Sequence, residues 1–146
     1  MSHTIEVREL VGDEILVIDP DEENFLTNLL RFGQQAIYTG TNMMFDSAVA
    51  QPMKGYVDAA LAGEREEAAR RHQGMEKIRA LHRRWVLQPW REAGLCPLGA
   101  IKFWTAQLGM TGGPVPAPLP GLDSAEQDRL RAELVAVGLV DEAAGR

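Results

Sequence analysis

Gly12-Asp13-Glu14-Ile15-Leu16-Val17-Ile18-Asp19-Pro20-Asp21 is the stretch that decides the predicted fold, because it sets four apolar residues between two polar turns. Three of these four are β-branched. A short continuous apolar run of this kind is typical of a strand that is buried on both faces, as strands are in parallel sheets. The stretch therefore predicts a buried strand at residues 15–18.

The residues that follow predict a helix and then a second strand. Phe25, Leu29 and Phe32 share one helical face between residues 22 and 33, acidic residues occupy the first turn, and Gly33 ends the pattern. Residues 36–39 have the composition of a short strand. Strand, helix and strand in so short a stretch predict a βα crossover, and the strands that it joins are parallel. An α/β fold is therefore expected for the first part of the chain.

Beyond Asp46 the sequence is helical nearly to its end. Apolar spacing, caps and Gly or Pro stops predict helices over residues 46–63, 64–88, 97–109 and 123–138. Proline stands at every second position from Pro114 to Pro120. Because proline fixes the backbone and donates no hydrogen bond, this run predicts a stiff extended strut. We expect two domains, residues 1–62 with the strands and residues 63–146 with the helices and the strut at 114–120.

Composition argues against several classes of protein. The chain has 146 residues, of which 45% are hydrophobic and 25% charged, an ordinary globular composition. Its net charge of −6 argues against nucleic-acid binding, and its apolar runs are far shorter than a membrane span. The N-terminus lacks a signal-peptide pattern, and Cys96 is the only cysteine, so no internal disulfide is possible. We expect a cytoplasmic protein with no nucleic-acid partner and no membrane partner.

One basic region departs from this acidic balance. Seven Lys or Arg residues lie between Arg70 and Arg91, against the single acid Glu76. Such a cluster could favour an anionic ligand or partner, but a solvated helix face is the more common explanation. His72 and Glu76 have the i,i+4 spacing that can hold a metal, although no third ligand is near in sequence. We expect no metal site.

Four motifs of this chain resemble the dihydrodipicolinate synthase and N-acetylneuraminate lyase family. Residues 114–139, PVPAPLPGLDSAEQDRLRAELVAVGL, resemble its C-terminal segment, in which a proline strut precedes a capped helix. Residues 96–104 resemble its Asn-Pro-x-Pro-x-Lys-x-Ala segment, with Cys96 in place of asparagine and Gly99 in place of a proline. Residues 60–70 resemble its Ala-x-x-Gly-Asp motif and the Glu-Ala-Arg that follows, and residues 36–42 stand where its eighth strand would be.

The resemblance covers residues 4–140, about the last half of the family's usual length. It implies the end of a TIM barrel: residues 4–12 as the remnant of the sixth helix, residues 15–18 as the seventh strand and residues 36–39 as the eighth. The expected fold class is therefore α/β, a partial TIM barrel of the last two βα units with parallel strands, followed by a C-terminal helical subdomain. Eight strands close such a barrel.

The family binds pyruvate or a related 2-keto acid as a Schiff base on a lysine of the sixth strand, with a tyrosine of the fourth strand as proton relay. Neither strand has a counterpart here. The only lysines, Lys54, Lys77 and Lys102, all fall in predicted helices, so we expect no catalytic residue and no cofactor. The resemblance implies the C-terminal subunit of a split 2-keto-acid aldolase or lyase, completed by a separate N-terminal half-barrel chain. Alone, such a subunit would be inactive.

The candidate substrate-binding residues follow the two predicted strands, because active sites of such barrels form at the carboxyl ends of strands. They are Asp19, Asp21, Glu22, Ile37, Tyr38 and Thr39. Ile37 matches a family isoleucine that packs beside pyruvate. The acids after Pro20 could hydrogen-bond a polyol or repel an anion, or they could simply cap the helix that follows. The alternative function is a helical interaction or regulatory module without chemistry, or an inactive fragment of the same family.

Overall fold

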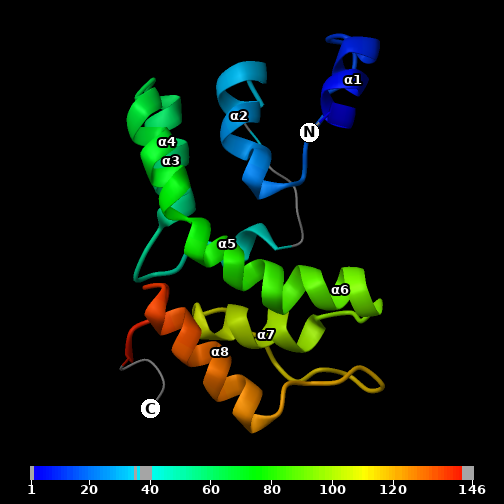
Figure 1. Ribbon diagram of the computed structural model, residues 1–146, viewed down its shortest axis with the longest axis vertical. Helices are drawn as coiled ribbons and strands as arrows, with labels where there is room; N and C mark the ends of the chain where they lie inside the picture. Colours follow the sequence, from blue (N-terminus) through cyan, green and yellow to red (C-terminus); the bar gives the residue numbers. More distant parts are fainter. Residues whose placement is uncertain (1, 35, 37–40, 143–146) are drawn as a thin grey trace.

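The computed structural model describes residues 2–34, 36 and 41–142, and all regular structure in these residues is helical (Figure 1). The predicted partial TIM barrel with parallel strands is therefore wrong for the part of the chain described. The helices are α1 (Ser2–Val11), α2 (Glu22–Phe32), α3 (Pro52–Leu61), α4 (Arg65–Gly74), α5 (Glu76–His82), α6 (Gln88–Ala93), α7 (Leu98–Gln107) and α8 (Ser124–Ala136). A 3-10 turn, η1 (Asn42–Met44), precedes α3, and a π turn, η2 (Arg83–Leu87), joins α5 to α6.

Residues 15–18 are not a strand, and Ile15 and Leu16 are 60% and 79% exposed. Side chains bind some of the backbone groups in and just after this run. The Arg8 guanidinium donates to the Val17 carbonyl at 2.9 Å, and the Gln34 side chain bonds both the N–H and the carbonyl of Asp19, at 3.1 and 3.2 Å. Because a strand needs a partner along at least one edge, this segment stays irregular.

The second predicted strand lies mostly outside the described residues. Ala36 has no regular secondary structure, and its carbonyl accepts a hydrogen bond from the Gln34 side chain at 2.7 Å. The apolar core is one cluster that runs from Phe25 to Val140, across the domain boundary expected between residues 62 and 63.

Helix α2 forms where the sequence predicts it. The Asp21 side chain accepts from the Glu23 N–H at the N-cap, and Gly33 ends the helix in the left-handed conformation with φ 66°. Its apolar face packs toward α3, where the Phe25 and Tyr56 rings meet edge to face with centroids 6.4 Å apart. This packing places the acidic first turn of α2 next to α5 and η2.

The basic helix predicted over residues 64–88 is interrupted. It divides at Met75, whose side chain is fully buried, into α4 and α5, and it continues through η2 into α6. Pro89 does not end it, because this proline lies in the first turn of α6, where its missing N–H costs nothing. Gly94 ends α6 in the left-handed conformation. Figure 1 shows α5 and α6 as a nearly continuous rod between the half of the molecule with α1 to α4 and the half with α7 and α8.

The C-terminal helices close the core beneath this rod. Trp104 of α7 is fully buried and donates its indole N–H to the Met44 carbonyl at 3.0 Å. The predicted strut is not extended throughout, because residues 117–119 form a turn in which the Leu119 N–H donates to the Pro116 carbonyl at 3.1 Å. The end of the strut passes so close to α7 that a Cβ on Gly99 would lie 3.0 Å from the Pro120 carbonyl oxygen. The Lys102 ammonium donates to the Pro114 carbonyl at 2.7 Å. In the part of the chain described, no helix is long and apolar enough to span a bilayer.

Candidate functional site

A cavity of about 400 Å³ opens between the first turn of α2 and the rod of α5, η2 and α6. Its wall combines acids from the start of α2 with arginines from the rod and a few apolar side chains. The lining residues are Pro20, Asp21, Glu22, Glu23, Thr41, Phe45, Arg79, His82, Arg83, Leu87 and Arg91. The cavity therefore joins segments that lie nearly sixty residues apart in the chain.

The inner wall is a buried ion pair. The Arg79 guanidinium donates to both carboxylate oxygens of Glu22, at 2.7 and 3.0 Å, and both side chains are buried. The Tyr56 hydroxyl donates to the same carboxylate at 2.9 Å, and Arg79 also donates to the His72 carbonyl at 2.7 Å. Each charge is therefore neutralised and hydrogen-bonded, which burial of a charge requires.

Two histidines flank this pair: His82 is buried, and His72 is partly buried. The His72 ring meets Tyr56 edge to face at 5.0 Å, and the His82 ring lies 5.2 Å from Phe45. Burial lowers the pKa of both imidazoles, and the Arg79 charge lowers that of His72 further. Both rings are therefore mainly neutral at pH 7. Among the described residues, neither Nε2 atom has a hydrogen-bond partner.

The outer wall carries one carboxylate and one guanidinium without an ionic partner. Arg83 is held between Glu23, at 2.5 Å, and Glu76. Asp21 caps α2 and forms no ion pair with a described residue, and the same is true of the exposed Arg91. The cavity mouth thus presents opposite charges that both remain available to a ligand.

Of the three predicted site residues that the structure describes, Asp21 and Glu22 line this cavity. Asp19 is buried outside its lining, where it accepts hydrogen bonds from the Asp21 N–H at 3.0 Å and from the Thr4 hydroxyl at 3.2 Å. Burial alone would raise the pKa of Asp19, but these hydrogen bonds hold it below its usual range. Asp19 therefore anchors α1 to α2. Ile37, Tyr38 and Thr39 lie outside the described residues.

The site residues predicted from the sequence did not include Arg79, His82 and Arg83, which line the cavity. Glu22 and Arg79 are 57 positions apart, so no local sequence pattern indicates their pairing. The available signal was the spacing of Arg79, His82 and Arg83, because residues at i, i+3 and i+4 share one face of a helix. His72 and Glu76 do not form a joint site, since His72 packs on Tyr56 while Glu76 binds Arg83.

No protein-family model matches the chain, and comparisons with curated proteins and with solved structures also find no match. The chemistry of the site therefore rests on its own geometry. A cavity of this size with paired charges inside and unpaired charges at its mouth has the character of a small-ligand site.

Proposed function

We propose that this chain is a helical subunit of a 2-keto-acid-dependent aldolase or lyase. It binds a second polypeptide that carries the Schiff-base lysine and with it completes the substrate site. The resemblance of four motifs to the dihydrodipicolinate synthase and N-acetylneuraminate lyase family supports the reaction class. That support is an analogy of family, so the structural observations below carry the subunit role.

The observation that carries the proposal is an apolar stretch at the N-terminal end of the chain. Four large apolar side chains between residues 7 and 16 are 44% to 86% exposed; they are Val7, Leu10, Ile15 and Leu16. So many exposed apolar residues in ten positions are typical of a protein interface rather than of a free surface. In Figure 1 the helix that begins this stretch, α1, lies at the edge of the molecule and is open on its outer side.

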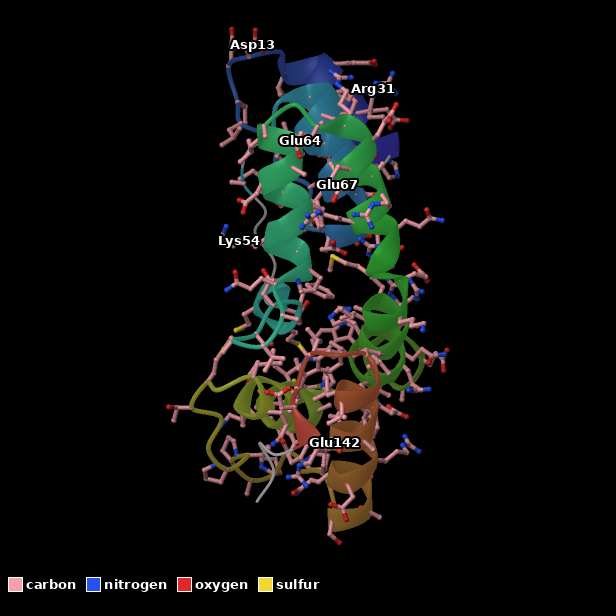
Figure 2. The ribbon with its side chains drawn as sticks, turned by 90° about the vertical axis from the view of Figure 1, so that its left-hand side faces the viewer. Asp13, Arg31, Lys54, Glu64, Glu67 and Glu142 are labelled. Carbon is pink, nitrogen blue, oxygen red and sulfur yellow. The ribbon has the colours of Figure 1, made fainter. Side chains whose placement is uncertain are left out.

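The three lysines support a nucleophile on the second polypeptide. A Schiff-base lysine needs a desolvated amine that loses its proton easily. Lys54 is exposed and paired with Asp58, and it lies at the surface of α3 in Figure 2. Lys77 is exposed as well, and Lys102 donates to the Pro114 carbonyl. None of the three lysines is buried.

Borohydride trapping tests the proposal. The chain is cross-linked in an extract of its source cells and treated with labelled pyruvate and borohydride, which reduces a Schiff base to a stable bond. Label is expected on the cross-linked second polypeptide and not on this chain. The double variant Leu10→Asp, Leu16→Asp should abolish cross-linking to the labelled polypeptide. Leu61→Asp is the matched control, because Leu61 is 59% exposed on α3 and lies outside the stretch.

Label on this chain itself would contradict the proposal. So would a labelled second polypeptide whose cross-linking is unchanged by the Leu10 and Leu16 substitutions.

A helical interaction module without chemistry is the second candidate. It is favoured by the closed core, in which Tyr56, Met75, Trp104, Leu130 and Leu134 are all fully buried within this chain. A module of this kind would still cross-link through residues 7–16, but its partner would take up no pyruvate label. The same experiment therefore separates the two functions.

A further inference from the structure

We propose that the cavity between α2 and the rod of α5, η2 and α6 binds a small zwitterion with an apolar side chain, of which a free α-amino acid is the simplest case. This inference uses only residues of this chain and does not depend on the second polypeptide. It assigns a ligand to the charged groups that the fold leaves unpaired.

The charge balance of the wall selects the ligand class. Three carboxylates and three guanidiniums line the cavity, and internal pairing consumes two of each: Glu22 with Arg79, and Glu23 with Arg83. Asp21 and Arg91 remain, and neither forms an ion pair with a described residue. A ligand that carries one ammonium and one carboxylate satisfies both.

Ligands of a single charge fit this wall less well. An anion would gain Arg91 but would lie beside the carboxylate of Asp21, and a cation would meet the converse repulsion. A zwitterion forms a charge-assisted hydrogen bond at each end and leaves no charge unpaired. The guanidinium of Arg91 is also suited to a carboxylate, because its donors match the two oxygens in a planar fork.

The rest of the lining favours an apolar side chain on the ligand. Pro20, Phe45 and Leu87 contribute apolar surface to the cavity. His82 lines the same cavity and is 8% exposed, and its Nε2 has no hydrogen-bond partner among the described residues. A buried polar atom without a partner is uncommon in native proteins and is often explained by an absent ligand or water.

Calorimetric titration of the purified chain with L-leucine tests the proposal. Leucine amide, which lacks the carboxylate, and N-acetyl-leucine, which lacks the ammonium, are the matched ligands. We expect leucine to bind and each derivative to bind at least about tenfold more weakly, the usual effect of losing one charge-assisted hydrogen bond. No binding of leucine, or binding of either derivative as tight as that of leucine, would overturn the assignment.

Three variants locate the ligand. Arg91→Gln should weaken leucine at least about tenfold while leaving leucine amide unchanged, because the lost contact is to the carboxylate. Asp21→Asn should weaken leucine but not N-acetyl-leucine, and asparagine still caps α2, so the helix is preserved. Lys77→Gln is the control for Arg91→Gln. Both variants remove one positive charge, but Lys77 is exposed on α5 and does not line the cavity. Leucine affinity that is equal in all three variants would place the ligand elsewhere and overturn the proposal.

Discussion

Glu22 and Arg79 form a buried ion pair across 57 residues of sequence, with the Arg79 Nε 2.7 Å from one carboxylate oxygen and its Nη2 3.0 Å from the other. The pair joins the first turn of α2 to α5. Together with the pair of Glu23 and Arg83, it is an electrostatic link between the N-terminal helices and the rod that lines the cavity.

Removing one partner of this pair should be costly. Glu22→Gln leaves the Arg79 charge buried without compensation, and we expect the free energy of unfolding to fall by about 3–5 kcal/mol. The double variant Glu22→Leu, Arg79→Met should recover much of that loss, because it removes both charges. Urea unfolding followed by circular dichroism measures both values.

The exposed pair of Lys54 and Asp58 is the control for this experiment, since both side chains are more than half exposed. Lys54→Ala should cost no more than about 1 kcal/mol. Equal losses for Glu22→Gln and Lys54→Ala would show that the buried pair does not have the role assigned to it.

Buried His82 and partly buried His72 should make the protein less stable in mild acid. Burial lowers the pKa of His72 and His82 below the ordinary value of 6.5, so the unfolded chain takes up these protons more readily than the folded one. The contribution of the neutral histidines to the free energy of unfolding is complete above pH 6.5 and is lost as the pH falls below that value. Unfolding curves between pH 7.5 and 5 measure this loss, and they stay above the range in which Asp19 titrates, because its hydrogen bonds hold the Asp19 pKa below its usual value.

The double variant His72→Gln, His82→Gln should flatten the pH dependence in this window. His3→Gln should leave it unchanged, because the His3 side chain is 96% exposed. A slope that persists in the double variant would refute the histidine origin of the effect.

The N-terminus of α8 should depend on one capping residue. Asp123 accepts from the Glu126 N–H at 2.8 Å, and the Glu126 carboxylate accepts in return from the Asp123 N–H at 2.9 Å, a complete capping box. Asp123→Ala should therefore cost about 1 kcal/mol of stability. Ser124→Ala should cost little, because Ser124 is the first helical residue and not the cap. Thermal unfolding distinguishes the two, and equal effects would contradict the assignment of the cap.

The path of the chain from α7 into the strut should depend on Gly112, which lies two residues before the strut begins. A Cβ at this position would lie 2.5 Å from the Lys102 carbonyl oxygen, a backbone atom that cannot move aside. Gly112→Ala should destabilise the protein by about 1–3 kcal/mol, the usual cost of overpacking. Gly121→Ala is the control, because a Cβ there meets nothing within 4 Å. If chemical denaturation finds both variants equally stable, the strut does not pack on α7 as described.

Features that depend on neighbouring residues could be predicted from the sequence. Asp21 and Gly33 mark the ends of α2, and Asp123 marks the start of α8, because caps act within a few residues. The predicted start of a helix was less accurate where the capping residue lies several positions before the first helical turn. The helix predicted from residue 46 begins at Pro52, although the Asp46 carboxylate still bonds the N–H groups of its first turn.

The predicted strand and most of the site depended on distant residues. The run at Ile15 is as apolar as a buried strand, but Arg8 and Gln34 bind the backbone on one side of it, and no feature of the run itself indicates this. Glu22 was predicted to face a substrate, and it does line a cavity. Its charge, however, is already used by Arg79, a partner that no local pattern reveals.

Amide hydrogen exchange at residues 15–19 of the free chain is the most direct test of whether residues 15–18 are an unpaired, exposed segment. The account predicts fast exchange at Leu16 and Ile18, whose N–H groups have no hydrogen-bond partner among the described residues, and slower exchange at Asp19, whose N–H is bonded to Gln34. Slow exchange throughout residues 15–18, as in a paired strand, would contradict the all-helical fold and the exposed apolar stretch on which the proposed function rests.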